Sequence, residues 1–388
     1  MPGGFDESAR FVRKFFDALA VGVNNRGATI AREPMKAEWK SFLTDAGAEF
    51  DPAHDDRVAS FGNPEREKRF TLTGLVLCDL SHQGLIEVHG EDAETFLQGQ
   101  LTTDVSKIDE HTSRLGGYCN PKGRLLASFR IFRLQDTFYL MLPDELVEPI
   151  IKRLQMFVLM SKVTLADAGC SLVRFGLSGD DAPAELEAAL GAAPAAVDEV
   201  IHVDGVTAIR VHGDLPRFVL LGELEPMQQL WDRLNVRGAP AGADSWRLLD
   251  IVAGVPTVYP ATSEAFVPQM VNLELLEGVS FRKGCYTGQE IVARMHYLGK
   301  LKRRMYRLHT DMDTIPEPGT ELFSSDNETS QPIGTLVDAA PWPDGGIEAL
   351  AVVTIQYADP DKPLNVGAAD GPGASLHLPP YSLEMERA

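Results

Sequence analysis

One short segment combines the residue types that thiol chemistry needs. In residues 281–290, which read FRKGCYTGQE, Cys285 follows Lys283 by two positions and lies just before an expected helix start. Free backbone N–H groups at a helix N-terminus and nearby cations favour a thiolate over a thiol. Gly284 and Gly288 leave room for the backbone to approach a ligand closely. The segment therefore indicates a reactive Cys285, and the alternative is a small cysteine buried in a tight turn.

A helix is expected to position this thiol. Thr287 followed by Glu290 has the spacing of a capping box, which predicts a helix that starts just after Thr287. Apolar residues then recur at helical spacing as far as Leu298.

The same region carries an unusual concentration of positive charge. Residues 282–307 hold eight Lys and Arg and one acidic residue, Glu290, whereas the whole chain has 36 basic and 56 acidic residues and a net charge of −20. A basic spot on an acidic chain favours a specific anion, such as a polycarboxylate or a phosphate. A solvated face, an RNA contact or an acidic partner protein are the alternatives. The overall charge argues against general binding of nucleic acid.

A second candidate lies in residues 119–124, CNPKGR. The order Asn120-Pro-Lys-Gly predicts a tight type I turn between two strands. It also places the cations Lys122 and Arg124 beside Cys119. By itself this is a good hairpin turn.

Other common site signatures are missing from the sequence. The nine histidines are scattered and the four cysteines form no C-x-x-C pair, so we expect no stable metal and a reducing, cytoplasmic location. There is no G-x-S-x-G, Walker loop or G-x-G-x-x-G. No apolar run reaches the ~20 residues of a membrane-spanning helix.

The length of 388 residues predicts two or three domains, of the α+β class because strands and helices mix without strict alternation. We expect residues 1–34 to be a flexible or non-native extension. Residues 35–165 and 166–240 read as two α+β domains. Residues 241–299 read as a linking, partly helical segment that carries the KGCYTGQE motif, and residues 300–388 as a small all-β barrel or sandwich.

KGCYTGQE at 283–290 resembles the signature of the YgfZ family of folate-binding proteins, whose mitochondrial relatives are Iba-type iron–sulfur assembly factors. The similarity covers roughly residues 40–388. It includes the following segments: Asp79-Leu80-Ser81, FLQGQLTTDV at 96–105, CNPKGR at 119–124, Ser161-Lys162-Val163, Trp246 with Gly254 and Pro256, Pro268-Gln269 with Asn272, and GKLKRR at 299–304.

This resemblance implies a fold, a ligand and a role. The fold would be three domains in a ring around a central hole, as in the T-protein (GcvT) of the glycine cleavage system, with two ferredoxin-like α+β domains and a C-terminal β-barrel. The protein would bind tetrahydrofolate in the hole and support the assembly or repair of [4Fe–4S] enzymes, including radical enzymes that modify tRNA. Its partners would be those enzymes or assembly factors, with no membrane and no direct nucleic acid.

The resemblance also implies site residues. Cys285 would be the reactive thiol at the rim of the hole, and the basic segment would receive the glutamate tail of the folate. The expected folate contacts are Lys283, Tyr286, Gln289, Arg294, Asn120, Lys122, Arg124, Gln269 and Asn272.

Two departures from T-protein bear on activity. T-protein carries an Asp-Asp pair after the first-domain hairpin and an acidic residue in a helix that holds the pterin. Here the matching positions are Ala127-Ser128 and Val252, so we do not expect aminomethyltransferase activity. A folate-dependent one-carbon transferase and a non-catalytic scaffold remain the alternatives.

Overall fold

The first sheet is built from strands whose residues are mostly buried. The computed structural model describes residues 35–324, 326–327, 331–362 and 364–383, so the prediction for residues 1–34 lies outside it. Five antiparallel strands pair in the order β5-β6-β7-β4-β8. Their bounds are Arg114–Cys119, Leu125–Leu134, Thr137–Pro143, Gln83–His89 and Thr164–Asp167.

Two helices and one short turn of helix accompany this sheet. They are α4 (Ala93–Gln98), α5 (Asp144–Gln155) and the 3₁₀ turn η2 (Val105–Lys107). Helix α5 packs against β4, β7 and β8 with an apolar face that includes Val147 and Leu154. This apolar stripe at helical spacing is what fixes the helix on the sheet.

The second sheet draws its strands from separate parts of the chain. Its order is β10-β11-β12-β9-β3-β13, antiparallel throughout except for the parallel pair β13 and β3. The strands span Val200–Val203, Val206–Val211, Arg217–Gly222, Val173–Ser178, Val76–Asp79 and Ala239–Ala241. Strand β3 precedes the whole first sheet in the chain. The predicted domain boundaries near residues 165, 240 and 299 stay a prediction. The pairing of β3 with β9 and β13 places residues 76–79 in the second sheet.

Aromatic packing fixes the outer helices of the second sheet. The rings of Trp39 and Trp231 meet edge to face at 5.7 Å, and both contact Phe175 of β9. The elements around this sheet are α2 (Ala37–Asp45), β1 (Glu49–Asp51), β2 (His54–Ser60), α3 (Pro64–Thr71), α6 (Ala182–Leu190) and α7 (Leu224–Leu234).

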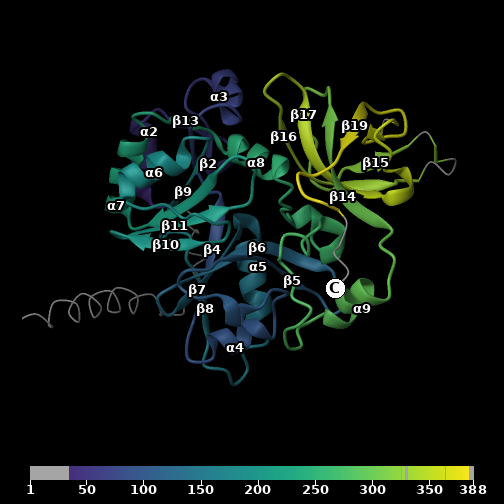
Figure 1. Cartoon of the computed structure of the whole chain (residues 1–388), viewed down its shortest axis with the longest axis horizontal. Coiled ribbons are helices and arrows are strands. Elements are labelled where there is room, and N and C mark those ends of the chain that lie inside the picture. The colour runs from purple at the N-terminus through teal and green to yellow at the C-terminus, as the bar shows by residue number, and fades with distance from the viewer. Residues whose placement is uncertain (1–34, 325, 328–330, 363, 384–388) are drawn as a thin grey trace, which may run out of the picture. The chain divides into compact units, whose positions relative to one another are not determined.

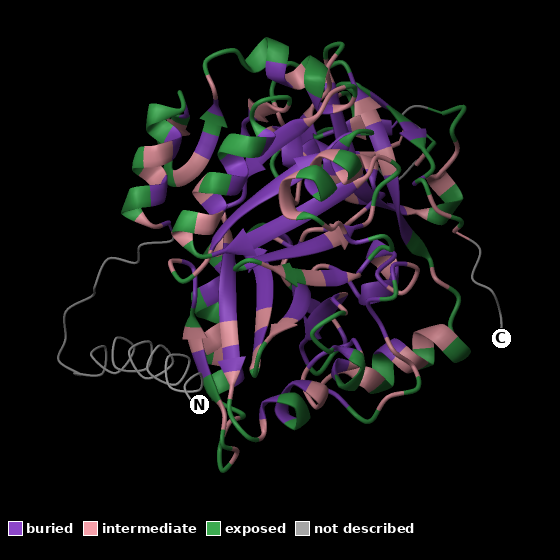
Figure 2. Cartoon of the chain, turned by 60° about the vertical axis from the view of Figure 1, so that its left-hand side comes forward, coloured by how far each residue is buried: buried purple, intermediate pink, exposed green. Residues whose placement is uncertain are grey.

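Strands of the C-terminal region close into a barrel, which confirms the C-terminal β-barrel that the family resemblance implies. The order is β14-β17-β16-β15-β18-β19, and β19 pairs back onto β14. The strands span Arg303–Thr310, Ile347–Thr354, Gly334–Pro341, Glu321–Phe323, Leu364–Val366 and Gly373–His377, with the 3₁₀ turn η5 (Ile355–Tyr357) after β17. The strands of the first sheet, the second sheet and the barrel are largely buried (Figure 2), whereas β1 and β2, which pair with each other, are more exposed.

Helix α8 (Ala243–Val252) contacts all of these parts. It packs against β2 and β3 on one side and against β16 and β17 of the barrel on the other (Figure 1). Trp246 lies so close to β9 that a Cβ atom at Gly176 would meet its ring at 2.2 Å. Helix α8 is followed by two 3₁₀ turns, η3 (Pro260–Thr262) and η4 (Pro268–Val271), and by α9 (Gln289–Tyr297).

Candidate functional site

Two separate features of the structure can do chemistry, and the first is the thiol loop, residues 281–288. Cys285 is a free cysteine and the only exposed one of the four, all of which lie in the described residues. Lys283 anchors the loop, because its Nζ donates hydrogen bonds to the carbonyl oxygens of Leu101 at 2.7 Å and Thr103 at 2.6 Å. Burial lowers the pKa of Lys283 to about 8. Its ammonium also lies 5.4 Å from the centre of the buried Tyr286 ring.

The thiol loop sits directly on the 120–124 turn. Gly288 has φ +84°, and a Cβ atom there would lie 2.5 Å from the carbonyl oxygen of Asn120. A Cβ at Gly123, where φ is +69°, would lie 2.9 Å from the Cβ of Ile291. The thiol loop and the 120–124 turn, which the sequence indicates as separate candidates, are therefore in close contact at Gly288 and Gly123.

The predicted capping box is wrong. Helix α9 begins at Gln289, with Gly288 in the left-handed conformation as N-cap and no side-chain cap. The close approach of Gly288 to the 120–124 turn sets the start of the helix in place of the Thr287 hydroxyl.

We expect Gly288→Ala to cost about 3 kcal/mol of unfolding free energy, because the left-handed conformation alone costs a side chain ~1–2 kcal/mol and the carbonyl contact adds to it. Gly284→Ala is the matched control, since nothing lies within 4 Å of a Cβ there. Urea unfolding of the two variants measures the difference. Equal stabilities would show that the loop does not depend on this contact.

The remaining predicted residues of the turn and helix mostly hold backbone. The Oδ1 atom of Asn120 accepts from the amides of Lys122 and Arg124 and so closes the turn. The Arg124 guanidinium donates to the carbonyl oxygens of residues 264 and 265, whereas Lys122 and Arg294 are exposed. Gln289 Nε2 donates to Gly284 O at 3.4 Å, inside the thiol loop.

Gln269 and Asn272 are buried beneath α9 and the barrel. Gln269 Nε2 donates to Val292 O at 2.7 Å, and Asn272 Nδ2 donates to Met305 O at 3.0 Å. Their carbonyl oxygens have no hydrogen-bond partner among the described residues. The side-chain amide of Gln269 thus ties η4 to helix α9, and that of Asn272 ties the end of η4 to strand β14 of the barrel.

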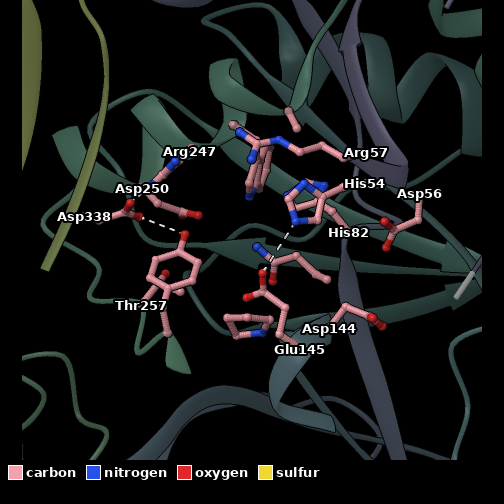
Figure 3. A pocket seen from close by; sticks show the side chains of 15 residues that line it. His54, Asp56, Arg57, His82, Asp144, Glu145, Arg247, Asp250, Thr257 and Asp338 are labelled. Atoms are coloured by element: carbon pink, nitrogen blue, oxygen red, sulfur yellow. Dashed lines mark hydrogen bonds and ion pairs between the residues drawn. The ribbon is translucent and has the colours of Figure 1, made fainter. Parts of the chain in front are cut away.

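The second feature is a pair of adjoining cavities around Trp246 and Asp250 of α8, which we call the central cavity. The larger one encloses about 770 Å³, counting the open solvent at its mouth (Figure 3). It is lined by His54, Asp56, Arg57, His82, Gln83, Pro143, Asp144, Glu145, Ala243, Trp246, Arg247, Asp250, Thr257, Tyr259 and Asp338.

The smaller cavity encloses about 530 Å³ and shares five of these residues. The shared residues are Gln83, Pro143, Trp246, Asp250 and Thr257. The others include Leu115, Ser128, Phe129, Arg130, His212, Arg217 and Val219. No residue of the thiol loop and none of the nine predicted folate contacts lines either cavity.

Charged pairs hold the walls of the central cavity. Arg217 Nη1 donates to Asp250 Oδ1 at 2.9 Å, and the Arg217 guanidinium lies 5.1 Å from the centre of the Trp246 ring. Arg247 pairs with Asp338 of β16, and Tyr259 donates its hydroxyl to the same carboxylate at 3.1 Å. These contacts join α8 to the second sheet and to the barrel.

Two half-buried imidazoles, one in the wall of each cavity, are neutral. Burial lowers the pKa of His82 to about 3 and that of His212 to about 4. In both rings Nδ1 has no hydrogen-bond partner among the described residues. These Nδ1 atoms are themselves buried, so a bound molecule reaches them only after a local shift of the wall.

Ser128, at the position where T-protein has an acidic pair, is engaged with backbone. Its hydroxyl donates to Pro256 O at 3.1 Å and accepts from the Val258 amide at 3.0 Å. Through these two hydrogen bonds the Ser128 hydroxyl holds the loop after α8.

Among the cavity residues, the sequence singles out only Trp246, Ser128 and Pro256. A usable signal was Arg217 at the start of the otherwise apolar strand β12, because a buried charge is rarely found unless it is paired. Among the described residues, no group of three or more His, Cys, Asp or Glu could hold a metal ion. None of the described helices is both long and apolar enough to cross a membrane.

Known proteins resemble this chain in sequence and in structure. The GCVT N-terminal domain family matches residues 39–212. The tRNA-modifying protein YgfZ of Klebsiella pneumoniae (strain 342) is 32% identical over 321 residues, which cover 83% of this chain and 96% of that protein. Its namesake from Enterobacter sp. (strain 638) is 33% identical over 312 residues, covering 80% and 94%.

A solved structure shares the fold. The glycine cleavage system aminomethyltransferase T from Bartonella henselae superposes with a TM-score of 0.74, covering 90% of this chain and 98% of that one. The two are 18% identical, so the likeness shows a common GcvT-like fold and confirms the predicted fold class.

Proposed function

This chain belongs to the YgfZ family, and from that premise we propose that it is a folate-binding accessory protein for the assembly or repair of [4Fe–4S] enzymes. Enzymes that modify tRNA would be among its clients, in keeping with the name of its relatives. We also propose that it acts in the cytoplasm, where thiols stay reduced.

The observation that carries the ligand part of this proposal is the central cavity. A folate carries a flat, polar pteridine ring, and the cavity offers an aromatic wall at Trp246 and polar groups at Asp250, His82 and His212. The half-buried rings of His82 and His212 stay neutral, so they add polarity to the wall without adding charge. A bound tetrahydrofolate would supply one-carbon or redox chemistry, and the protein residues would bind and orient it.

Cys285 is the proposed reactive thiol. Its exposure allows a partner protein to reach the sulfur, and Lys283 and the contact with the 120–124 turn hold its backbone. Iron–sulfur clusters usually take four cysteine ligands. We therefore propose that any cluster handled by Cys285 is shared with a partner.

Five of the nine predicted folate contacts fall into two groups according to their exposure. Lys122, Gln289 and Arg294 stay proposed contacts for the anionic glutamate tail of a folate, because they are at least partly exposed beside the thiol loop. For Gln269 and Asn272 a direct contact needs local opening, because they are only 2% and 0% exposed.

Expression of this chain in a bacterium that lacks its own YgfZ tests the proposal. We expect restored activity of [4Fe–4S] enzymes that modify tRNA, measured as the modified-nucleoside content of tRNA. No restoration at normal protein levels would contradict the accessory role.

A further inference from the structure

We propose that Asp250 recognises the ligand of the central cavity and selects a flat heterocycle that presents two adjacent N–H donors. The amino group and ring N–H of a 2-amino-4-oxopteridine form such an edge. This inference rests on the proposed function, that the cavity holds a folate, and it adds the group that determines which ring is accepted.

Asp250 lies where the two cavities meet. It lines both of them from helix α8, across from Asp144 and Glu145 at the start of α5 (Figure 3). Its side chain is 16% exposed, so a ligand in the cavity can reach it.

One carboxylate oxygen is fixed and the other is available. Oδ1 accepts from Arg217 Nη1 at 2.9 Å, and no hydrogen bond from a described residue reaches Oδ2. Arg217 is itself held, because it donates to the carbonyl oxygen of His212 and packs its guanidinium over Trp246. The carboxylate is therefore preorganised, and its free oxygen is an acceptor for a ligand N–H.

The charges around Asp250 favour a donor rather than an anion. The larger cavity is lined by five carboxylates and two guanidinium groups. Both arginines are already paired, Arg57 with Asp244 and Arg247 with Asp338. An anionic group such as the glutamate tail finds no free cation there, so the part of the ligand bound at Asp250 must be its N–H donor edge.

The ring chemistry makes this recognition selective. A carboxylate pairs strongly with two parallel N–H donors. A 2,4-dioxopteridine has a carbonyl oxygen in place of the 2-amino group, and that oxygen would face the carboxylate without a proton between them. His82 and His212, both neutral, add no charge that would favour either ring.

A fluorescence titration with pterin and with its 2,4-dioxo analogue lumazine tests the inference. We expect the intact protein to bind pterin about 10- to 100-fold more tightly than lumazine. Asp250→Asn should reduce that ratio to about threefold or less, because the amide can donate to the lumazine carbonyl. The Asn side chain still offers Arg217 an oxygen acceptor, which keeps the buried guanidinium bonded.

Asp232→Asn is the matched control, because it makes the same chemical change at an exposed position of α7 that lines neither cavity. It should keep the selectivity of the intact protein. Equal binding of pterin and lumazine by the intact protein would overturn the inference. A folded Asp250→Asn protein that keeps the preference for pterin would also overturn it. If the intact protein binds neither pterin nor tetrahydrofolate, the proposed function itself fails.

Discussion

Replacing Cys285 by alanine is expected to abolish rescue of a strain that lacks YgfZ, down to the level of an empty vector. Cys285 is the only exposed thiol of the chain's four cysteines, whereas Cys78 and Cys119 are buried and Cys170 is half-buried. Burial raises the pKa of the Cys119 thiol to about 12, which makes it inert at neutral pH. Modified nucleosides in tRNA, measured by mass spectrometry, give the readout.

Two further variants make this experiment specific. Cys170→Ala should rescue fully, because it removes a cysteine that the proposal does not use. Cys285→Ser should fail like Cys285→Ala, since a hydroxyl keeps a polar group at the same place but has neither the acidity of a thiol nor its affinity for iron. Full rescue by Cys285→Ala would remove the thiol from the mechanism and favour the scaffold alternative.

Replacing Arg217 by methionine is expected to lower the free energy of unfolding by about 3–5 kcal/mol. The change leaves the Asp250 carboxylate without its cation and removes the guanidinium from the Trp246 ring. Arg217 is 1% exposed, so water cannot replace either contact. Urea denaturation followed by tryptophan fluorescence measures the loss.

An exposed ion pair provides the control for this prediction. Lys162 and Glu91 lie 2.6 Å apart with side chains 71% and 76% exposed. Lys162→Met should therefore cost less than about 1 kcal/mol. A cost for Arg217→Met as small as that of the control would show that the cavity wall does not depend on the Arg217–Asp250 pair.

The parts of the fold that the sequence predicts well are those built from local patterns. The hairpin around Asn120–Arg124 follows from turn residues between two strands, and the all-β C-terminal region follows from short strands separated by turns. Strand β3 was not predicted as part of the second sheet, because its partner β9 lies about a hundred residues further along the chain. Periodicity carries no information about such pairings.

The thiol loop was found from sequence and the central cavity was not, for a physical reason. Cys285, Lys283 and Gly288 lie in one octapeptide, so their spacing is visible. Asp250 and Arg217 come from different elements and meet only after folding.

The basic segment shows the same limit of sequence reasoning. Arg304 and Arg307 belong to the concentration of positive charge at 282–307. In the structure they pair with Glu274, which precedes that segment, and with Glu348 from β17. Residues 282–307 therefore carry fewer unpaired cations than their eight Lys and Arg residues suggest.

The central claim is that the cavity around Trp246 and Asp250 binds tetrahydrofolate. Calorimetric titration of tetrahydrofolate into the intact protein, Cys285→Ala and Thr257→Trp tests it, because Thr257 lines both cavities and an indole there would fill them. We predict saturable binding of one folate to the first two proteins and none to a folded Thr257→Trp protein. Absence of binding to the intact protein, or unchanged binding to folded Thr257→Trp, would contradict the claim.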